Sequence, residues 1–214
     1  LVIRQATDAL NAYEHSKALE VIESFFWQFC DDYIELVKNR AYGTADAHGK
    51  VPSDAAVKSA RTTLGLGLDA FARLLAPYLP FATEEVWSWM HTGEGSVHRA
   101  AWPKADIYAA AATGASPETL AWAGKAVEQL RKIKSEAKVS MKTPILSVTL
   151  AAVKDGIDAI KSALDDVAQA GRVIGKFDLA EKHAEEAAAE GEGDDTVVID
   201  ASELGEPPAK KAKK

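Results

Sequence analysis

The feature that most constrains the fold of this chain is a long segment whose apolar and aromatic residues recur every three or four positions. Between Ala18 and Val37 the recurring residues are Leu19, Ile22, Phe26, Phe29, Tyr33 and Val37. This spacing places them on one face of an α-helix, which has about 3.6 residues per turn. Phe25, Trp27 and Cys30 widen the stripe, so we expect a helix that is buried on more than one side.

Two further helices are predicted before the first glycine-rich turn. A polar loop over residues 43–53 precedes a second apolar stripe over residues 57–78. This second helix is expected to end at Pro77 and Pro80, because proline has no backbone donor and clashes with the preceding helical turn. Thr83 is predicted to cap the third helix, with two glutamates in its first turn. Together these segments predict a helical bundle.

The pattern changes after the bundle, which we expect to occupy residues 1–106. Residues 107–116 are rich in alanine and are predicted to be a linker, and Ser116 followed by Pro117 predicts the start of another helix. The elements expected after that helix are a strand, a helix and a second strand, at residues 144–153, 156–170 and 171–177. We therefore predict a mainly α protein with a small α/β appendage over residues 117–179.

The last part of the chain, residues 180–214, is expected to be a mostly disordered acidic tail, although residues 196–199 can add an edge strand. From Asp178 onward the sequence holds 11 acidic and 5 basic residues, while the net charge of the whole chain is −7. The acidity is therefore concentrated in the tail, and the rest of the chain is close to neutral. A neutral body can still bind RNA through a local basic face, so the net charge does not exclude a nucleic-acid partner.

The composition indicates a soluble globular protein, with 47% hydrophobic and 27% charged residues. No apolar run approaches the roughly 20 residues needed to cross a bilayer, so no membrane partner is expected. The single Cys30 cannot form an internal disulfide, which fits a reducing, cytoplasmic location. The chain opens without an initiator methionine, which suggests a fragment of a longer protein.

The sequence carries no recognisable motif for catalysis or cofactor binding. It has no glycine-rich phosphate loop, and its five histidines are scattered instead of standing at metal-ligand spacing. His91 and His98 could meet across a turn, but two isolated histidines make a weak metal site. We therefore expect no catalytic residue, no metal and no cofactor in this chain.

Two groups of residues are candidates for contact with a polyanion. In the first, on the helix after Pro117, Arg131, Lys134 and Lys138 cluster beside the apolar stripe, while Lys132 lies elsewhere on the helix and Lys142 follows in the loop. The second lies at a helix end and consists of Lys38, Asn39, Arg40 and Tyr42. Cations that border a packed face can bind a phosphate backbone. Each group also has an ordinary explanation. The cations of the first can simply keep the protein soluble, and those of the second can complement the dipole of their helix.

Several stretches resemble the class I aminoacyl-tRNA synthetases for valine, isoleucine and leucine. Residues 25–40 resemble the aromatic helix of that family, and residues 74–87 resemble its second hallmark. Residues 96–103, in which Ser-Val-His leads to Ala-Trp-Pro, resemble a third hallmark of the family. Their order matches the anticodon-binding helical bundle that follows the catalytic core in this family. Residues 130–136 resemble the basic helix after the bundle and, with Cys30, favour the valine type.

The resemblance implies a parent enzyme that joins valine to its tRNA with ATP and Mg, and a fragment that is inactive alone because it lacks the catalytic core. The ATP-handling signatures His-x-Gly-His and Lys-Met-Ser-Lys-Ser do not occur in the sequence. The implied partners are a valine tRNA and the missing core of the same chain. The residues expected to contact RNA are Tyr13, Lys17, Lys38, Arg40 and Tyr42 in the bundle and Arg131, Lys132, Lys134 and Lys138 beyond it.

Two alternatives remain open from the sequence. The chain could belong to an isoleucine or leucine ligase, or it could be a helical interaction module that does not bind RNA. One departure from the family is visible, because valine enzymes of the common bacterial type end in a long coiled coil that touches the tRNA elbow. Here the sequence turns strand-like after Pro144 and ends in an acidic tail, which suggests a different subtype.

Overall fold

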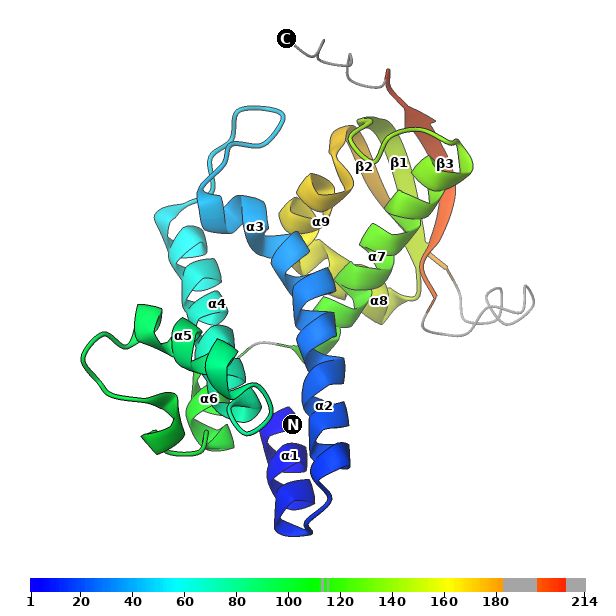
Figure 1. Ribbon diagram of the computed structural model, residues 1–214. Coiled ribbons are helices and arrows are strands. Elements are labelled where there is room, and N and C mark those ends of the chain that lie inside the picture. Colours follow the sequence, from blue (N-terminus) through cyan, green and yellow to red (C-terminus); the bar gives the residue numbers. More distant parts are fainter. Residues whose placement is uncertain (113, 115, 183–195, 207–214) are drawn as a thin grey trace. The chain divides into compact units, whose positions relative to one another are not determined.

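The computed structural model describes residues 1–112, 114, 116–182 and 196–206 (Figure 1). Tertiary contacts divide the chain into two compact units that interleave along the sequence. The first, here called the bundle unit, comprises Leu1–Ile34 and Asp54–Ala115, and the second, the α/β unit, comprises Glu35–Ser53 and Ser116–Lys214. The sequence-based boundary at residue 106 groups residues 35–53 differently, since it places them with the bundle.

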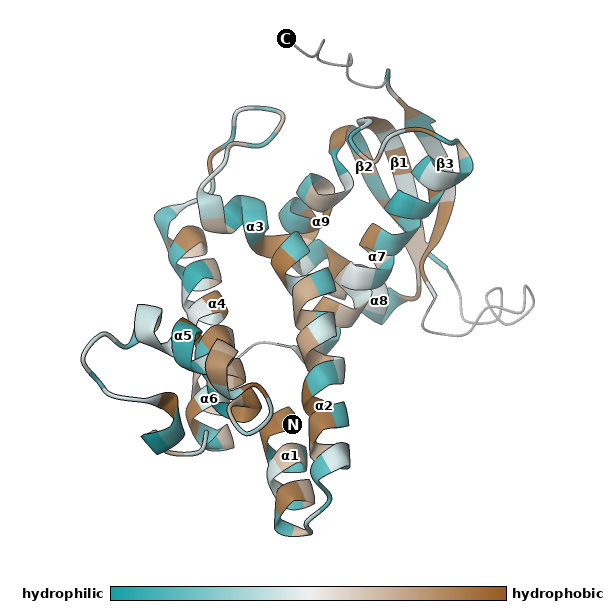
Figure 2. Cartoon of the chain, viewed as in Figure 1, coloured by the Kyte–Doolittle hydropathy of each residue, from teal (hydrophilic) through white to brown (hydrophobic). Residues whose placement is uncertain are grey.

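Helices make up the regular structure of the bundle unit in the described residues. They are α1 (Val2–Asn11), α2 (His15–Gln28), the π-helix η1 (Phe29–Ile34), α4 (Asp54–Leu75), α5 (Pro80–Met90), the 3₁₀ turn η2 (Val97–Arg99) and α6 (Ala105–Ala111). Helices α1, α2 and α4 each carry hydrophobic and hydrophilic residues, as amphipathic helices do (Figure 2). The predicted helical bundle is confirmed.

The core of the bundle unit is aromatic. The Phe71 ring of α4 lies 5.3–5.7 Å, centroid to centroid, from the rings of Phe25, Phe26 and Phe29. Such tilted and edge-to-face pairs add to the stabilisation that comes from burying the rings. Helix α4 approaches this cluster closely at Gly67, because a Cβ there would lie 2.6 Å from the Phe29 ring. The glycine is thus required for close packing.

Three details of the bundle unit differ from the sequence-based prediction. The helix expected over residues 18–37 is interrupted by η1, and α3 (Glu35–Tyr42) follows it. Helix α5 begins at Pro80 with Leu79 as its N-cap, so the prediction that Thr83 caps it is wrong. The Thr83 hydroxyl instead donates to the backbone oxygen of Leu79 inside the first turn. The first half of the segment expected to be a linker, residues 107–111, belongs to α6 (Ala105–Ala111).

The α/β unit contains a small mixed sheet. Its elements are α3, α7 (Pro117–Glu136), β1 (Ile145–Ala152), α8 (Lys154–Ser162), α9 (Leu164–Gly171), β2 (Val173–Glu181) and β3 (Val198–Leu204). The strand order is β2-β1-β3, with β2 parallel and β3 antiparallel to the central β1. The expected strands and the α/β class are confirmed.

The α/β unit also departs from the prediction in detail. The helix expected over residues 156–170 is divided into α8 and α9, and the edge strand expected over residues 196–199 continues to Leu204. Strand β3 therefore lies inside the segment predicted to be mostly disordered. The remainder of that prediction, over residues 183–195 and 207–214, lies outside the described residues.

Apolar residues from strands and helices together form the core of the α/β unit. The buried members include Leu130, Ile145, Leu150, Ile160 and Val167. Helices α7, α8 and α9 contact one another, and each contacts at least one strand (Figure 1). Of the helices in the described residues, none is both long enough and apolar enough to span a bilayer.

Candidate nucleic-acid interface

Two of the predicted RNA-contacting residues lie near the turn between α1 and α2. Tyr13 is 85% exposed and has a φ of 61°, in the left-handed region that bulky residues rarely adopt. Lys17 is exposed, and its ammonium lies 2.9 Å from the carboxylate of Glu14. Exposed pairs of this kind contribute ~0–1 kcal/mol, so a phosphate can displace Glu14 at little cost. Both residues remain available to a ligand.

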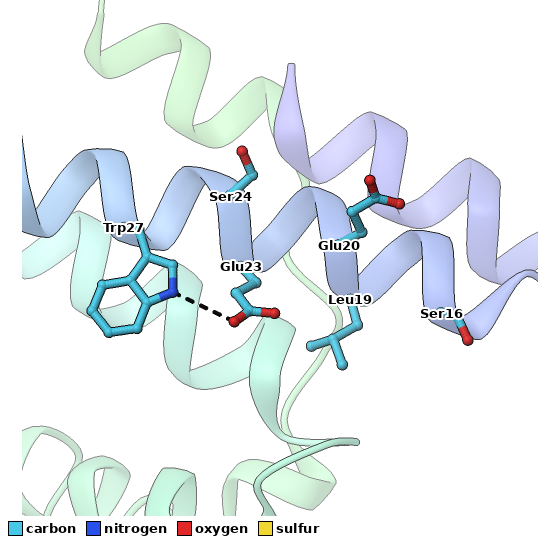
Figure 3. A pocket seen from close by; sticks show the side chains of 6 residues that line it. All are labelled: Ser16, Leu19, Glu20, Glu23, Ser24 and Trp27. Atoms are coloured by element: carbon cyan, nitrogen blue, oxygen red, sulfur yellow. Dashed lines mark hydrogen bonds between the residues drawn. The ribbon is translucent and has the colours of Figure 1, made fainter.

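A shallow hollow on α2 was not predicted from the sequence. It has a volume of about 410 Å³ and is lined by Ser16, Leu19, Glu20, Glu23, Ser24 and Trp27 (Figure 3). Trp27 is 54% exposed, whereas its neighbours Phe26 and Phe29 pack against the core. The available signal in the sequence was the position of Trp27, which lies beside the apolar stripe and one turn after a glutamate.

At the end of α3 the predicted residues have different environments. The Arg40 guanidinium lies 2.9 Å from the Asp166 carboxylate of α9, with side chains 25% and 14% exposed. Burial raises the pKa of Asp166, and the positive charge of Arg40 opposes that rise. Lys38 is 2.6 Å from Glu35, and Tyr42 is 78% exposed. Arg40 therefore holds α3 to α9, while Tyr42 is free to stack on a base.

Lys134 is the clearest departure from the predicted interface. Its side chain is 2% exposed, and its ammonium donates to the backbone oxygens of Gly171 at 2.7 Å and Met141 at 3.3 Å. Burial lowers the pKa of Lys134 to about 8, and the charges of Arg172 and Arg131 act in the same direction. Gly171 is the last residue of α9, so Lys134 binds a helix-terminal carbonyl. In this conformation it cannot contact a phosphate.

The other three predicted residues of α7 and its end are exposed. Arg131 lies 3.7 Å from Glu35, with a side chain that is 45% exposed. Lys132 is exposed, and Lys138 follows the helix with a φ of 53°. These three cations and Lys142, which is also exposed, can reach a phosphate without breaking a buried contact.

Two histidines of the bundle unit, His91 and His98, make structural contacts. Both ring nitrogens of His91 face carboxylate oxygens, those of Asp69 at 3.1 Å and Glu94 at 2.9 Å. The ring of His98 contacts the backbone oxygen of Pro80 instead of His91. Within the part of the chain that the structure describes, no group of side chains could hold a metal ion.

The fold defines a class of protein, a helical bundle with a small α/β appendage, and these surfaces carry exposed cations and aromatic rings. Comparison with known families agrees, because residues 1–150 match the model of the anticodon-binding domain of tRNA ligase. That match covers more than half of the sequence. The chain belongs to this anticodon-binding domain family.

The individual relatives that match this chain have names more specific than that of the domain family. A valine–tRNA ligase from Bifidobacterium longum (strain NCC 2705) is 79% identical over 213 residues, which is 100% of this chain and 23% of the relative. The valine–tRNA ligase from Cutibacterium acnes is 42% identical over 212 residues, which is 99% of this chain and 22% of the relative. That from Leifsonia xyli is 46% identical over 173 residues. The chain thus spans about a quarter of the length of these curated relatives.

Proposed function

We propose that this chain is the anticodon-binding region of a cytoplasmic valine–tRNA ligase. The observation that carries the proposal is the 79% identity, over the whole chain, to a protein named valine–tRNA ligase. The complete ligase would join valine to its tRNA with ATP and Mg, and its catalytic core would lie in the part of the relatives that this chain does not cover. The partners of this region are then a valine tRNA and the rest of the ligase.

The structure supports a reduced set of RNA contacts for this function. Arg40 and Lys134 are engaged inside the α/β unit, so we assign them to stability. The proposed contacts are Tyr13, Lys17, Lys38, Tyr42, Arg131, Lys132 and Lys138. Exposed cations would bind phosphates, and exposed rings would stack on unpaired bases, as in the recognition of single-stranded RNA.

The proposal is tested by binding of the chain to valine, isoleucine and leucine tRNAs at two salt concentrations. We expect tighter binding to the valine tRNA and a steep loss of affinity as salt rises, because phosphate contacts release counterions. A preference for the isoleucine or leucine tRNA would assign the chain to that ligase. A folded chain that binds none of the three at low salt would contradict an RNA-binding function.

A further inference from the structure

Two turns of the α/β unit are joined by one buried ammonium. Lys134 of α7 donates to the backbone oxygens of Met141, in the turn before β1, and of Gly171, at the end of α9. The residue that follows each acceptor is an exposed cation, Lys142 in the first turn and Arg172 in the second. Because both acceptors lie within 3.3 Å of one nitrogen, Lys134 brings the two cations to the same end of the unit.

Positive charge at this end of the unit is only partly compensated. Among the described residues, neither Lys142 nor Arg172 forms an ion pair with a carboxylate. Arg131, one turn before Lys134 on α7, lies 3.7 Å from Glu35 with a side chain that is 45% exposed. Besides burial, the charges of Arg172 and Arg131 lower the pKa of Lys134, so the three positive charges repel one another. An anion bound beside them would relieve that repulsion.

The end of α9 does not need an arginine for its own stability. Cations at the end of a helix often serve only to balance its dipole. Lys134 already does this for α9, since its ammonium is 2.7 Å from the Gly171 carbonyl. Arg172 is the C-cap of α9 and has a φ of 56°, a left-handed conformation that glycine usually supplies at the end of a helix. An exposed arginine in this conformation is better explained by a ligand than by the helix.

The chemistry of the exposed side chains favours phosphate groups as that ligand. A guanidinium binds two phosphate oxygens through parallel N–H bonds, and a lysine adds a mobile point charge. The backbone of a polynucleotide repeats such groups at short intervals, so it can engage several cations at once. Contacts of this kind fix the position of a nucleic acid and do not depend on its base sequence.

We propose that Arg131, Lys142 and Arg172 form a phosphate-binding surface of the α/β unit, held in place by Lys134, for the sugar–phosphate backbone of the tRNA. This inference rests on the proposed function and adds Arg172 and Lys142 to the contacts named there. The identity of the bases plays no part in it, so the surface contributes affinity and orientation to every tRNA that reaches it.

The test measures binding of the valine tRNA at several salt concentrations near pH 7. Arg172→Asn with Lys142→Gln removes two charges, and asparagine keeps the turn because it tolerates the left-handed conformation. This double variant should bind roughly 10-fold more weakly, and its slope of log affinity against log salt concentration should be shallower by about 2. The matched control, Lys154→Gln with Lys161→Gln, removes two exposed charges from α8 and should keep the slope of the parent chain.

Lys134 is tested by the dependence of affinity on pH. Because its pKa is lowered to about 8, the free chain loses this proton between pH 7 and pH 9, whereas a nearby phosphate would retain it. The affinity of the parent chain should therefore fall roughly fivefold over this interval, as expected if a bound phosphate makes protonation about tenfold more favourable. Lys134→Met cannot titrate and should lack this fall, whereas a purely structural lysine would leave the two pH profiles parallel.

The possible outcomes separate this surface from the proposed function. Lys142→Gln alone should make the salt slope shallower by about 1, and it leaves the turn at the end of α9 intact. If the parent chain binds valine tRNA selectively but both this variant and the double variant keep the parent slope, the phosphate-binding surface is overturned while the proposed function stands. Parallel pH profiles would overturn the placement of a phosphate beside Lys134. If the parent chain binds none of the three tRNAs, the proposed function itself fails.

Discussion

The bundle unit and the α/β unit bury polar groups in opposite ways. In the bundle unit, Thr83 is the buried polar residue among those described, and its hydroxyl bonds to the backbone of its own helix. The α/β unit encloses the ammonium of Lys134 and nearly encloses the ion pair of Arg40 with Asp166. Loss of one charged side chain should therefore affect folding in the α/β unit, whereas exposed groups of the bundle unit should affect binding.

The polar cluster of the bundle unit around Asp69 is an exception to this contrast, because Asp69 and Arg73 are about as buried as Asp166 and Arg40. Its carboxylate is 20% exposed and accepts hydrogen bonds from Arg73 and Tyr108, at 3.0 Å and 2.6 Å. Burial alone would raise the pKa of Asp69, but these hydrogen bonds outweigh it and hold the pKa below its usual range. The cluster is well supplied with donors, so it needs no ligand to compensate its charge.

The largest expected effect is on the stability of the α/β unit. Lys134→Ala should lower the free energy of unfolding by roughly 2–4 kcal/mol, because it leaves a cavity and removes the donor to the Gly171 carbonyl. Denaturant titrations followed by circular dichroism would measure the loss. Lys132→Ala, on the same helix but exposed, should change stability by less than about 0.5 kcal/mol. If both variants lowered the free energy of unfolding equally, the expected difference between a buried and an exposed lysine would be contradicted.

The same lysine predicts a dependence on pH. Because its pKa is lowered to about 8 in the fold and is near 10.5 when unfolded, the unfolded chain binds more protons between these values. Stability should therefore rise from pH 8 to pH 10.5, by up to about 3 kcal/mol, and the gain should be lost as the pH falls through 8. Unfolding curves of the parent and of Lys134→Met should diverge over this interval. Parallel pH profiles would show that Lys134 does not titrate in this way.

A smaller loss of stability is expected at the ion pair between α3 and α9. Arg40→Met should cost roughly 1–3 kcal/mol, because it leaves the Asp166 carboxylate largely buried without its partner. Adding Asp166→Asn should recover part of the loss by removing that charge. The control is Lys50→Met, since Lys50 pairs with the neighbouring Asp165 while both side chains are at least 65% exposed. Thermal unfolding of the three variants would show whether burial or mere pairing matters.

The smallest expected effect is on RNA binding by single exposed cations. Lys132→Ala and Lys138→Ala should each weaken valine tRNA binding by less than about 10-fold. Each should also reduce the slope of log affinity against log salt concentration by about 1. They should not change the preference among tRNAs, since phosphates carry no sequence information. Lys161→Ala, on α8, provides a comparison of equal charge. An unchanged salt slope in the first two variants would remove them from the proposed contacts.

Hydrophobic periodicity predicted most of the secondary structure, and it failed where packing decided the backbone conformation. The apolar stripes of α2, α4 and α7 and the β-branched run of β1 were recognisable because large residues repeat at the period of the element. Helix α1 has no counterpart in the prediction, although its apolar residues Val2, Ile3, Ala6, Ala9 and Leu10 recur at helical spacing. The π-helix η1 depends on local packing of the aromatic core.

The RNA-contacting residues were less predictable because exposure is a tertiary property. Lys134 follows the buried residues Val127 and Leu130 by seven and four positions, so its place on the apolar stripe was visible in the sequence. Its bond to the carbonyl of Gly171 was not, because it joins residues that are 37 positions apart along the chain. The hollow beside Trp27 was missed for the same reason, since only the fold shows which rings the core leaves uncovered.

The interleaving of the two units imposes an order of events during synthesis. Helix α3 leaves the ribosome before its packing partner α9, which ends at Gly171, roughly 130 residues later. At translation rates of about 5–20 residues per second, α3 waits on the order of ten seconds for that contact. Every element of the bundle unit has been synthesised by residue 115, so this unit can fold first. Residues 35–53 are inserted in its sequence, and they can pack only after the rest of the α/β unit has been synthesised.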